Sequence, residues 1–163
     1  MNGGIKQMLN FEYVNGKINM IISSVDKLNE LKNISRSEFV AKPDLYAVGE
    51  HHLRRSLEAM LATGRHIIAR MGLGYPKDYG CIIKIMEESG ILKGNLVHGI
   101  KELAGFRNRL VHCDPEPAPE ELHNLICRCL EEFEGYCRQV TDYVDALSRQ
   151  GRPVYNGSDY RHR

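Results

Sequence analysis

The sequence predicts an all-α protein, an antiparallel bundle of four or five helices. Apolar residues recur every three or four positions in several long segments, which is the repeat of a helix that buries one face. No segment alternates apolar and polar residues over a convincing strand length, and glycine or proline separates the helical segments. With 163 residues, of which 42% are hydrophobic and 26% charged, the chain can form one soluble domain with its own core.

The first two expected helices occupy the N-terminal half of the chain. The first begins at Asn15 or Gly16 and ends before a serine-rich polar segment. The second begins around Ser37, is interrupted by Pro43 and continues to residue 71, because proline cannot remain inside a regular helix. One face of it, with Glu58 among four arginines, is interpreted as solvated. The opposite, apolar face is formed by Leu53, Leu57, Met60, Leu61, Ile67, Ile68 and Met71.

Three further helices are expected in the C-terminal half. A short helix over residues 78–89 is followed by Gly90, a residue type suited to the position after a helix end. The next helix follows Asn95 and is apolar around more than one face, so we expect it to be central to the core. The last helix opens with Pro119 and two glutamates, residues that favour a helix N-terminus. Its apolar stripe is the cleanest in the chain and includes Cys129 and Cys137, whose expected role is core packing.

One helical domain is expected over residues 15–149. Residues 1–14 carry no periodicity and are interpreted as a flexible arm, and residues 150–163 are interpreted as a disordered tail. Together the stripes of the domain place in one core Leu57, Leu61, Ile68, Leu103, Phe106, Leu130 and Phe133.

Composition restricts the class of protein. The formal net charge is +1, so bulk charge gives no argument for a nucleic-acid partner. No apolar run reaches membrane-spanning length, and no signal peptide is visible, so we expect no membrane partner. The five cysteines form an odd number and suggest reduced thiols in a cytoplasm. The spacing of cysteine and histidine fits no common zinc pattern, and we expect neither a metal nor a cofactor.

The clearest candidate catalytic residues lie where the fourth expected helix ends. Arg107 and His112 are five positions apart, and Pro115 stops the helix directly after Asp114. Histidine exchanges protons near neutral pH, and the planar guanidinium of arginine matches phosphate oxygens. Such a pair can cleave RNA without a metal if the 2′-hydroxyl of the substrate is the nucleophile. The corner therefore predicts a candidate ribonuclease site.

Helix geometry complicates this prediction. Five residues of an ideal helix leave the two side chains roughly 140° apart around the axis. Arg109, three residues before His112, lies closer to the histidine's face, so the pair Arg109 and His112 stays open as an alternative. A distortion at the proline corner would bring Arg107 and His112 together, and so would a dimer in which two corners build one cleft. Small residues on the same helix, Gly99, Ala104 and Gly105, would allow close approach of a second helix and favour the dimer.

Residues 105–112, Gly-Phe-Arg-Asn-Arg-Leu-Val-His, resemble the signature of the HepT-like family of HEPN-domain proteins. Residues 50–69 resemble the long second helix of that family, and residues 74–91 resemble its middle section. The resemblance covers roughly residues 14–147.

The resemblance implies a homodimeric helical bundle that joins through the motif-bearing helices. It implies the toxin of a type VII-like toxin–antitoxin pair, a metal-independent endoribonuclease whose cleft combines the Arg-x4-His motifs of both protomers. Arg107 and His112 match the catalytic pair, and Asn108 matches the polar residue that helps shape the site. Arg109 and Asp114 are then candidate substrate-binding residues. The implied partners are RNA and a small MntA-like nucleotidyltransferase antitoxin.

The sequence departs from the family at one functional position. In several members the antitoxin transfers AMP to a tyrosine two residues after the histidine, and here that residue is Asp114. No tyrosine occurs from Cys113 to Pro119, so we expect no AMP transfer there. This departure supports an alternative function, a non-catalytic helical binding partner of a minimal nucleotidyltransferase. A third interpretation, a bundle that only acts as a scaffold, is disfavoured by the intact set of Arg107, Asn108 and His112.

Overall fold

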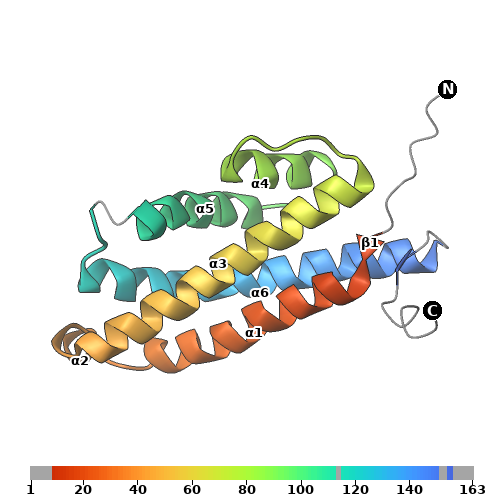
Figure 1. Cartoon of the computed structure of the whole chain (residues 1–163). Coiled ribbons are helices and arrows are strands. Elements are labelled where there is room, and N and C mark those ends of the chain that lie inside the picture. Colours follow the sequence, from red (N-terminus) through yellow and green to blue (C-terminus); the bar gives the residue numbers. More distant parts are fainter. Residues whose placement is uncertain (1–8, 113–114, 151–153, 156–163) are drawn as a thin grey trace, which may run out of the picture.

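The computed structural model is an elongated bundle of helices, and it describes residues 9–112, 115–150 and 154–155 (Figure 1). Three long helices form its body: α1 (Phe11–Lys32), α3 (Pro43–Met71) and α6 (Pro119–Arg149). Three shorter ones complete it: α2 (Arg36–Ala41), α4 (Tyr79–Glu88) and α5 (Leu96–His112). Two short strands, β1 (Leu9–Asn10) and β2 (Val154–Tyr155), pair in parallel. The prediction of an all-α fold is confirmed, with six helices among the described residues where at most five were expected.

The additional helix results from the break at Pro43. Lys42 is extended, with φ −118° and ψ 99°, because a residue before proline is pushed out of the helical region. Pro43 then takes the first position of α3, where its missing N–H costs nothing. The segment predicted as one interrupted helix is therefore two helices.

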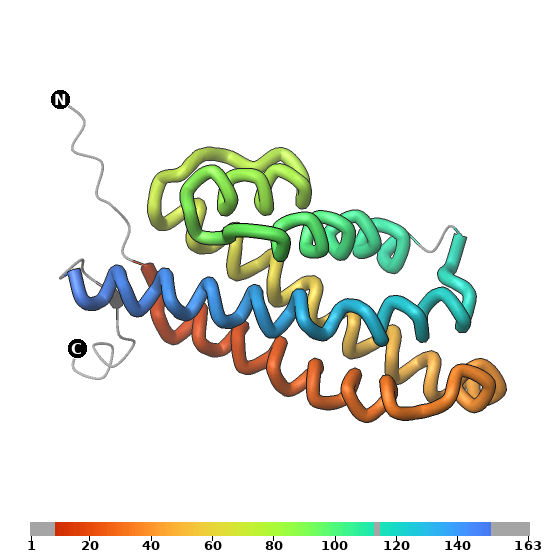
Figure 2. Tube along the Cα trace, turned by 180° about the vertical axis from the view of Figure 1, so that it is seen from behind, coloured from red at the N-terminus to blue at the C-terminus, as the bar shows by residue number. Residues whose placement is uncertain are grey.

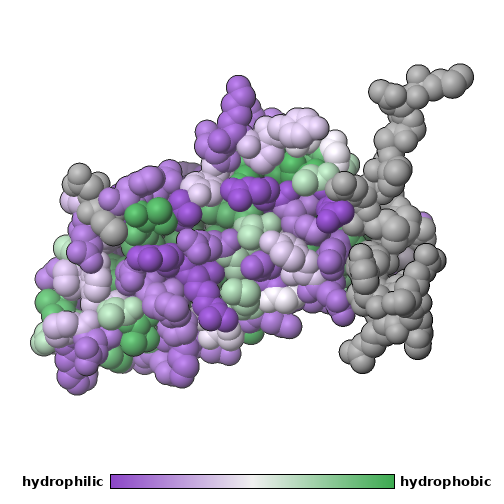
Figure 3. Space-filling model, viewed as in Figure 1, coloured by the Kyte–Doolittle hydropathy of each residue, from purple (hydrophilic) through white to green (hydrophobic). Residues whose placement is uncertain are grey.

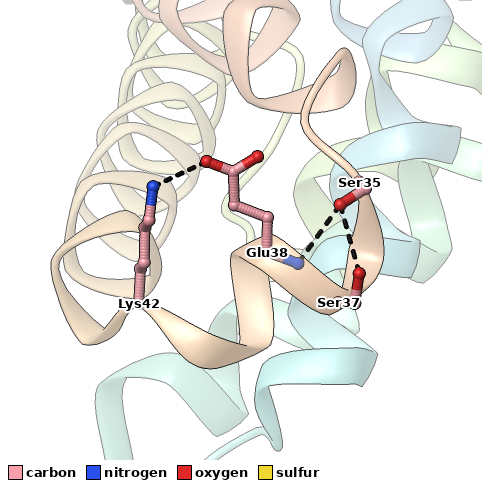
Figure 4. A network of polar contacts seen from close by, with 4 residues as sticks. All are labelled: Ser35, Ser37, Glu38 and Lys42. Atoms are coloured by element: carbon pink, nitrogen blue, oxygen red, sulfur yellow. Dashed lines mark hydrogen bonds and ion pairs between the residues drawn. The ribbon is translucent and has the colours of Figure 1, made fainter.

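Local polar contacts stabilise the short α2 (Figure 4). The hydroxyl of Ser35 accepts a hydrogen bond from the backbone N–H of Glu38 at 3.2 Å, which satisfies a free donor of the first turn. The ammonium of Lys42 lies 2.6 Å from a carboxylate oxygen of Glu38, one turn earlier. These contacts explain how a helix of 6 residues forms between α1 and α3.

The N-terminal boundary differs from the expected one. The helix begins at Phe11, because the side chain of Asn10 caps it by accepting a hydrogen bond from the N–H of Tyr13 at 2.9 Å. The prediction of a flexible arm over residues 1–14 is thus wrong for residues 9–14, which lie in β1 and α1. Residues 1–8 lie outside the described part. The prediction of a disordered tail over residues 150–163 is wrong for Val154–Tyr155, which pair with β1. The rest of that tail lies outside the described residues, apart from Gln150 at the end of α6.

The core lies where the long helices meet. Figures 1 and 2 show α1 on one side of α3 and α6, with α4 and α5 on the other. Tyr136 of α6 is completely buried, and its hydroxyl donates a hydrogen bond to the carbonyl of Met60 at 2.7 Å, which satisfies its polar end. The expected core is confirmed: Phe106 is half-buried and packs against it, and the other members are buried, namely Leu57, Leu61, Ile68, Leu103, Leu130 and Phe133.

Close contacts at two glycines set the position of α4 and α5. A β-carbon on Gly64 of α3 would lie 2.7 Å from side-chain atoms of Ile82 and Met86, so only glycine admits α4 at this distance. Gly90 ends α4 with φ +71°, as the sequence predicted. On α5, a β-carbon at Gly99 would meet Glu132 of α6 at 2.6 Å. Gly64 and Gly99 therefore serve packing within the chain, between α3 and α4 and between α5 and α6.

Most of the face shown in Figure 3 is hydrophilic, with separate hydrophobic patches. Among the described helices, none is both long enough and apolar enough to cross a membrane.

The contact at Gly64 predicts a destabilising substitution. Gly64→Ala should lower the free energy of unfolding by about 1–3 kcal/mol, because the added methyl group overpacks the α3–α4 contact. Gly16→Ala is the matched control, since among the described residues no atom outside its own stretch of α1 lies within 4 Å of the place that its methyl group would take. That variant should be stabilised by about 0.5–1 kcal/mol through helix propensity. Urea unfolding of both variants measures the difference, and equal stabilities would contradict the packing argument.

Candidate functional site

The corner after α5 is tied to the body of the bundle. Helix α5 ends at His112, as expected, and the chain turns through the proline-rich segment to Pro119 at the start of α6. The hydroxyl of Tyr46 in α3 donates a hydrogen bond to the carbonyl of Pro117 at 2.8 Å. This bond fixes the corner against α3. A cavity of about 100 Å³ lies beside it, lined by Tyr46, Glu50, Arg54, Arg109, Leu110, Glu116 and Pro117.

Arg107 turns away from this corner towards α3 and α4. Its side chain is only 16% exposed, and its Nη2 lies 3.6 Å from Oε1 of Glu58 in α3. Its guanidinium carbon lies 4.3 Å from the centroid of the Tyr79 ring at the start of α4. Its Nε is buried without a hydrogen-bond partner among the described residues. Arg107 is therefore a largely desolvated cation between two other helices.

His112 and Asn108 have the opposite environment. Both are exposed on α5, and no hydrogen bond or ion pair of the His112 ring is found within the described part of the chain. The contacts of Arg107 lie on α3 and α4, so a single chain does not bring Arg107 and His112 into contact. This outcome agrees with the roughly 140° that the helix repeat sets between them.

Arg109, the alternative partner of His112, is engaged elsewhere. Both of its terminal nitrogens contact the carboxylate of Glu121 in α6, with Nη2 3.1 Å from Oε2. This two-pronged bond raises the pKa of Arg109 above its usual value and, as the largest cause, holds the pKa of Glu121 below its usual value. The guanidinium also lies over the ring of Phe106, 5.4 Å from its centroid. Arg109 thus links α5 to α6 across the corner. Asp114, the remaining candidate, lies outside the described residues.

A wide groove of about 750 Å³ opens on the α6 side of the same region. It places basic, acidic and apolar side chains together, so it is large enough for a ligand but not selective for one charge. Its lining is Arg36, Phe106, Ala118, Glu120, Glu121, Asn124, Leu125, Cys127 and Arg128.

The cysteines and histidines of the described residues show no arrangement for a metal. Cys129 and Cys137 are buried in the core, as expected, and burial raises the pKa of these thiols to about 12 and about 11. Within the described part of the chain, no three His, Cys, Asp or Glu side chains come together as ligands.

The two residues that enclose Arg107, Glu58 and Tyr79, are not among the site residues predicted from the sequence. The apolar pattern places Glu58 on the solvated face of its helix, and it gives no role to Tyr79. One signal was available for each: Glu58 is an acidic residue among four arginines, and Tyr79 is an aromatic residue directly after Asp78, a residue type that often caps helices.

Comparison with known families agrees with this architecture. The profile of the family described as Ribonuclease HepT-like matches residues 21–140. The chain belongs to this family. A curated relative, the tRNA nuclease HepT of Aphanizomenon flos-aquae (strain 2012/KM1/D3), is 25% identical over 136 residues, which cover 82% of this HepT-like chain and 91% of that protein.

Solved structures share the HepT-like fold. A crystal structure of a toxin–antitoxin with AMP-PNP has a TM-score of 0.73 at 21% identity and covers 80% of this chain and 98% of the other. The tri-AMPylated HEPN toxin of Shewanella oneidensis in complex with MNT antitoxin has a TM-score of 0.72 at 20% identity, with coverages of 87% and 99%. The cytosolic protein YutE of Bacillus subtilis, of unknown function, has a TM-score of 0.69 at 18% identity, with coverages of 86% and 95%. At these identities the similarity shows the fold alone.

Proposed function

We propose that this HepT-like protein is the toxin of a type VII-like toxin–antitoxin pair and a metal-independent endoribonuclease. The observation that carries the proposal is that Arg107 and His112 of α5 have different environments. Arg107 is a largely desolvated cation in contact with Glu58 and Tyr79, and His112 is exposed at the helix end. A fixed guanidinium suits a phosphate, and an accessible imidazole suits proton transfer. The name of the relative from Aphanizomenon flos-aquae, a tRNA nuclease, supports RNA as the class of substrate.

The proposed reaction uses the substrate's own nucleophile. The 2′-hydroxyl oxygen attacks the adjacent phosphorus, the bond from phosphorus to the 5′ oxygen breaks, and the products carry a 2′,3′-cyclic phosphate and a 5′-hydroxyl. His112 exchanges the protons of these two oxygens, and Arg107 holds the charged phosphate oxygens. Asn108 is exposed and directly follows Arg107 in the sequence, and it shapes the site. Arg109 lies at the edge of the site.

The site as proposed needs two copies of the chain. Arg107 and His112 make no contact with each other within one chain, so a cleft that uses both is completed across a two-fold dimer. Figure 3 shows hydrophobic surface over the end of α5 nearest the corner, and the side chain of Val111 is 37% exposed there. Among the described residues, a methyl group at Gly105 would meet no atom within 4 Å outside its own stretch of helix, which leaves room for a second helix. We therefore place α5 near the dimer axis.

The dimer is tested by light scattering at tens of micromolar protein. The wild type should have the mass of two chains, and Val111→Glu should shift it towards one, because a charge in an apolar interface is costly. Ile22→Glu on α1 is the matched control, since Ile22 is also an exposed apolar residue, at 48%. A monomeric wild type, or a dimer broken by the control and not by Val111→Glu, would count against a cleft built on α5.

Substitutions at the proposed pair test catalysis. Arg107→Ala and His112→Ala should each lower RNA cleavage by about 10²–10⁴-fold, the usual contribution of acid–base catalysis. Arg107→Lys should not restore activity, because an ammonium lacks the two-pronged geometry. The losses should not multiply in the double variant, since the residues act as one unit, and Arg109→Ala should be milder. Cleavage assays with EDTA and product analysis measure these effects.

Circular dichroism serves as the folding control for these variants. If the purified wild type cleaves no RNA while a nucleotidyltransferase still binds it tightly, the alternative function, a non-catalytic binding partner, replaces the ribonuclease.

The proposed partner is a nucleotidyltransferase of the MntA type. The support is the similarity to toxins solved with MNT or MntA antitoxins. With Asp114 two residues after His112, the antitoxin should transfer no AMP between Cys113 and Pro119, because no tyrosine hydroxyl is present there. Mass spectrometry after co-expression with a cognate nucleotidyltransferase checks this expectation, and an adenylylated residue in that segment would overturn it.

A further inference from the structure

Three helices meet at the guanidinium of Arg107. Glu58 approaches it from α3, Tyr79 from α4, and the arginine itself projects from α5. We propose that Glu58 and Tyr79 are positioning residues that hold Arg107 with one edge of its guanidinium presented to an RNA phosphate. The proposal rests on the proposed ribonuclease function and assigns a role to two residues outside the Arg-x4-His motif.

The contact with Glu58 orients the guanidinium without saturating it. Oε1 of Glu58 lies 3.6 Å from Nη2, a distance for an ion pair but too long for a strong hydrogen bond. No hydrogen bond of Nη1 is found among the described residues. Because the contact of this carboxylate is with Nη2, Nη1 and the edge between the two terminal nitrogens are left for phosphate oxygens.

Tyr79 fixes the plane of the same group. The guanidinium carbon lies 4.3 Å from the ring centroid, so the positive charge faces the negative face of the aromatic ring. The ring belongs to the first residue of α4, whose start is fixed by Asp78, the acceptor of a hydrogen bond from the backbone N–H of Cys81 at 2.7 Å. A rigid ring therefore restricts rotation of a side chain that is otherwise flexible, and positioning before the reaction is what a phosphate-binding arginine requires.

A second ion pair in the chain provides a matched control. Glu87 of α4 and Lys101 of α5 lie 2.8 Å apart and join neighbouring helices as Glu58 and Arg107 do. Its two side chains are about half exposed, at 44% and 45%, and neither contacts Arg107. Glu87→Gln therefore removes a carboxylate that links α5 to another helix and leaves the arginine untouched.

Binding is measured with a 2′-O-methyl RNA, which cannot be cleaved because its nucleophile is blocked. Glu58→Gln and Tyr79→Leu should each weaken binding by at least about tenfold, up to the roughly 100-fold that small misplacement can cause. Tyr79→Phe keeps the ring face and should bind like the wild type, and so should Glu87→Gln. In an Arg107→Ala background, Glu58→Gln and Tyr79→Leu should have no further effect, because both act through the arginine.

Three outcomes would overturn the positioning role. If Glu58→Gln binds RNA as tightly as the wild type or more tightly, the carboxylate competes with phosphate for Arg107 instead of holding it. If the losses persist in the Arg107→Ala background, Glu58 and Tyr79 support the fold and not the arginine. If Glu87→Gln weakens binding as much as Glu58→Gln, the loss comes from any broken ion pair between α5 and a neighbouring helix, and Glu58 has no specific role in positioning Arg107.

Cleavage of unmodified RNA is assayed in parallel and separates the two proposals. A wild type that binds the blocked RNA and shows the expected dependence on Arg107, but cleaves nothing, would remove the ribonuclease function and leave the positioning role. The arrangement is also measured without RNA, by NMR of the Arg107 Nε–H group. The ring of Tyr79 should shift this resonance, and Tyr79→Leu should abolish the shift. A resonance that Tyr79→Leu leaves unmoved would contradict the stacking.

Discussion

The helical repeat of α5 is the constraint on which the site depends. Five residues separate Arg107 from His112, and an ideal helix turns such a pair roughly 140° apart. One of them must then face the bundle if the other faces solvent. In this chain the arginine is the inward residue, between Glu58 and Tyr79, and the histidine is the outward one. The same geometry that prevents a site within one chain makes α5 suitable for a site between two chains.

The contacts around the corner have a different purpose. The two-pronged bond from Arg109 to Glu121 and the hydrogen bond from Tyr46 to Pro117 link α5, α3 and the start of α6. A charge already bound in this way to a carboxylate is poorly suited to leave for a substrate. The two arginines that precede His112 therefore have different environments. Arg109 fixes the corner, and Arg107 has no hydrogen bond at Nη1 among the described residues.

Periodicity in the sequence predicted the long helices, since the apolar stripes of α3 and α6 match buried faces. It could not predict where α1 begins, because the side chain of Asn10 sets that boundary through one local hydrogen bond. Likewise, Pro43 separates two helices because of its effect on Lys42, which an apolar pattern does not show.

The surroundings of the candidate site were harder to predict. Periodicity identifies which face of a helix is buried, but it does not show which polar side chains meet across helices. Arg107 lies 49 residues from Glu58 and 28 residues from Tyr79 along the chain, so no local pattern connects them. The motif residues themselves could be predicted, because their residue types and their spacing lie within one short segment of the sequence.

The enclosure of Arg107 is difficult to explain by stability alone. Its Nε is buried without a partner among the described residues, and a buried donor left unpaired costs about 1–3 kcal/mol. Its ion pair with Glu58 is long, and half of the Glu58 side chain, 52%, is exposed, so screening by water reduces its attraction. An apolar side chain of similar length would fill the space beside Tyr79 without the cost of desolvating a charge. A sequence selected for folding alone would therefore favour leucine or methionine at this position. A guanidinium at this position, with no hydrogen bond of Nη1 among the described residues, agrees with the proposed role in binding a negatively charged phosphate.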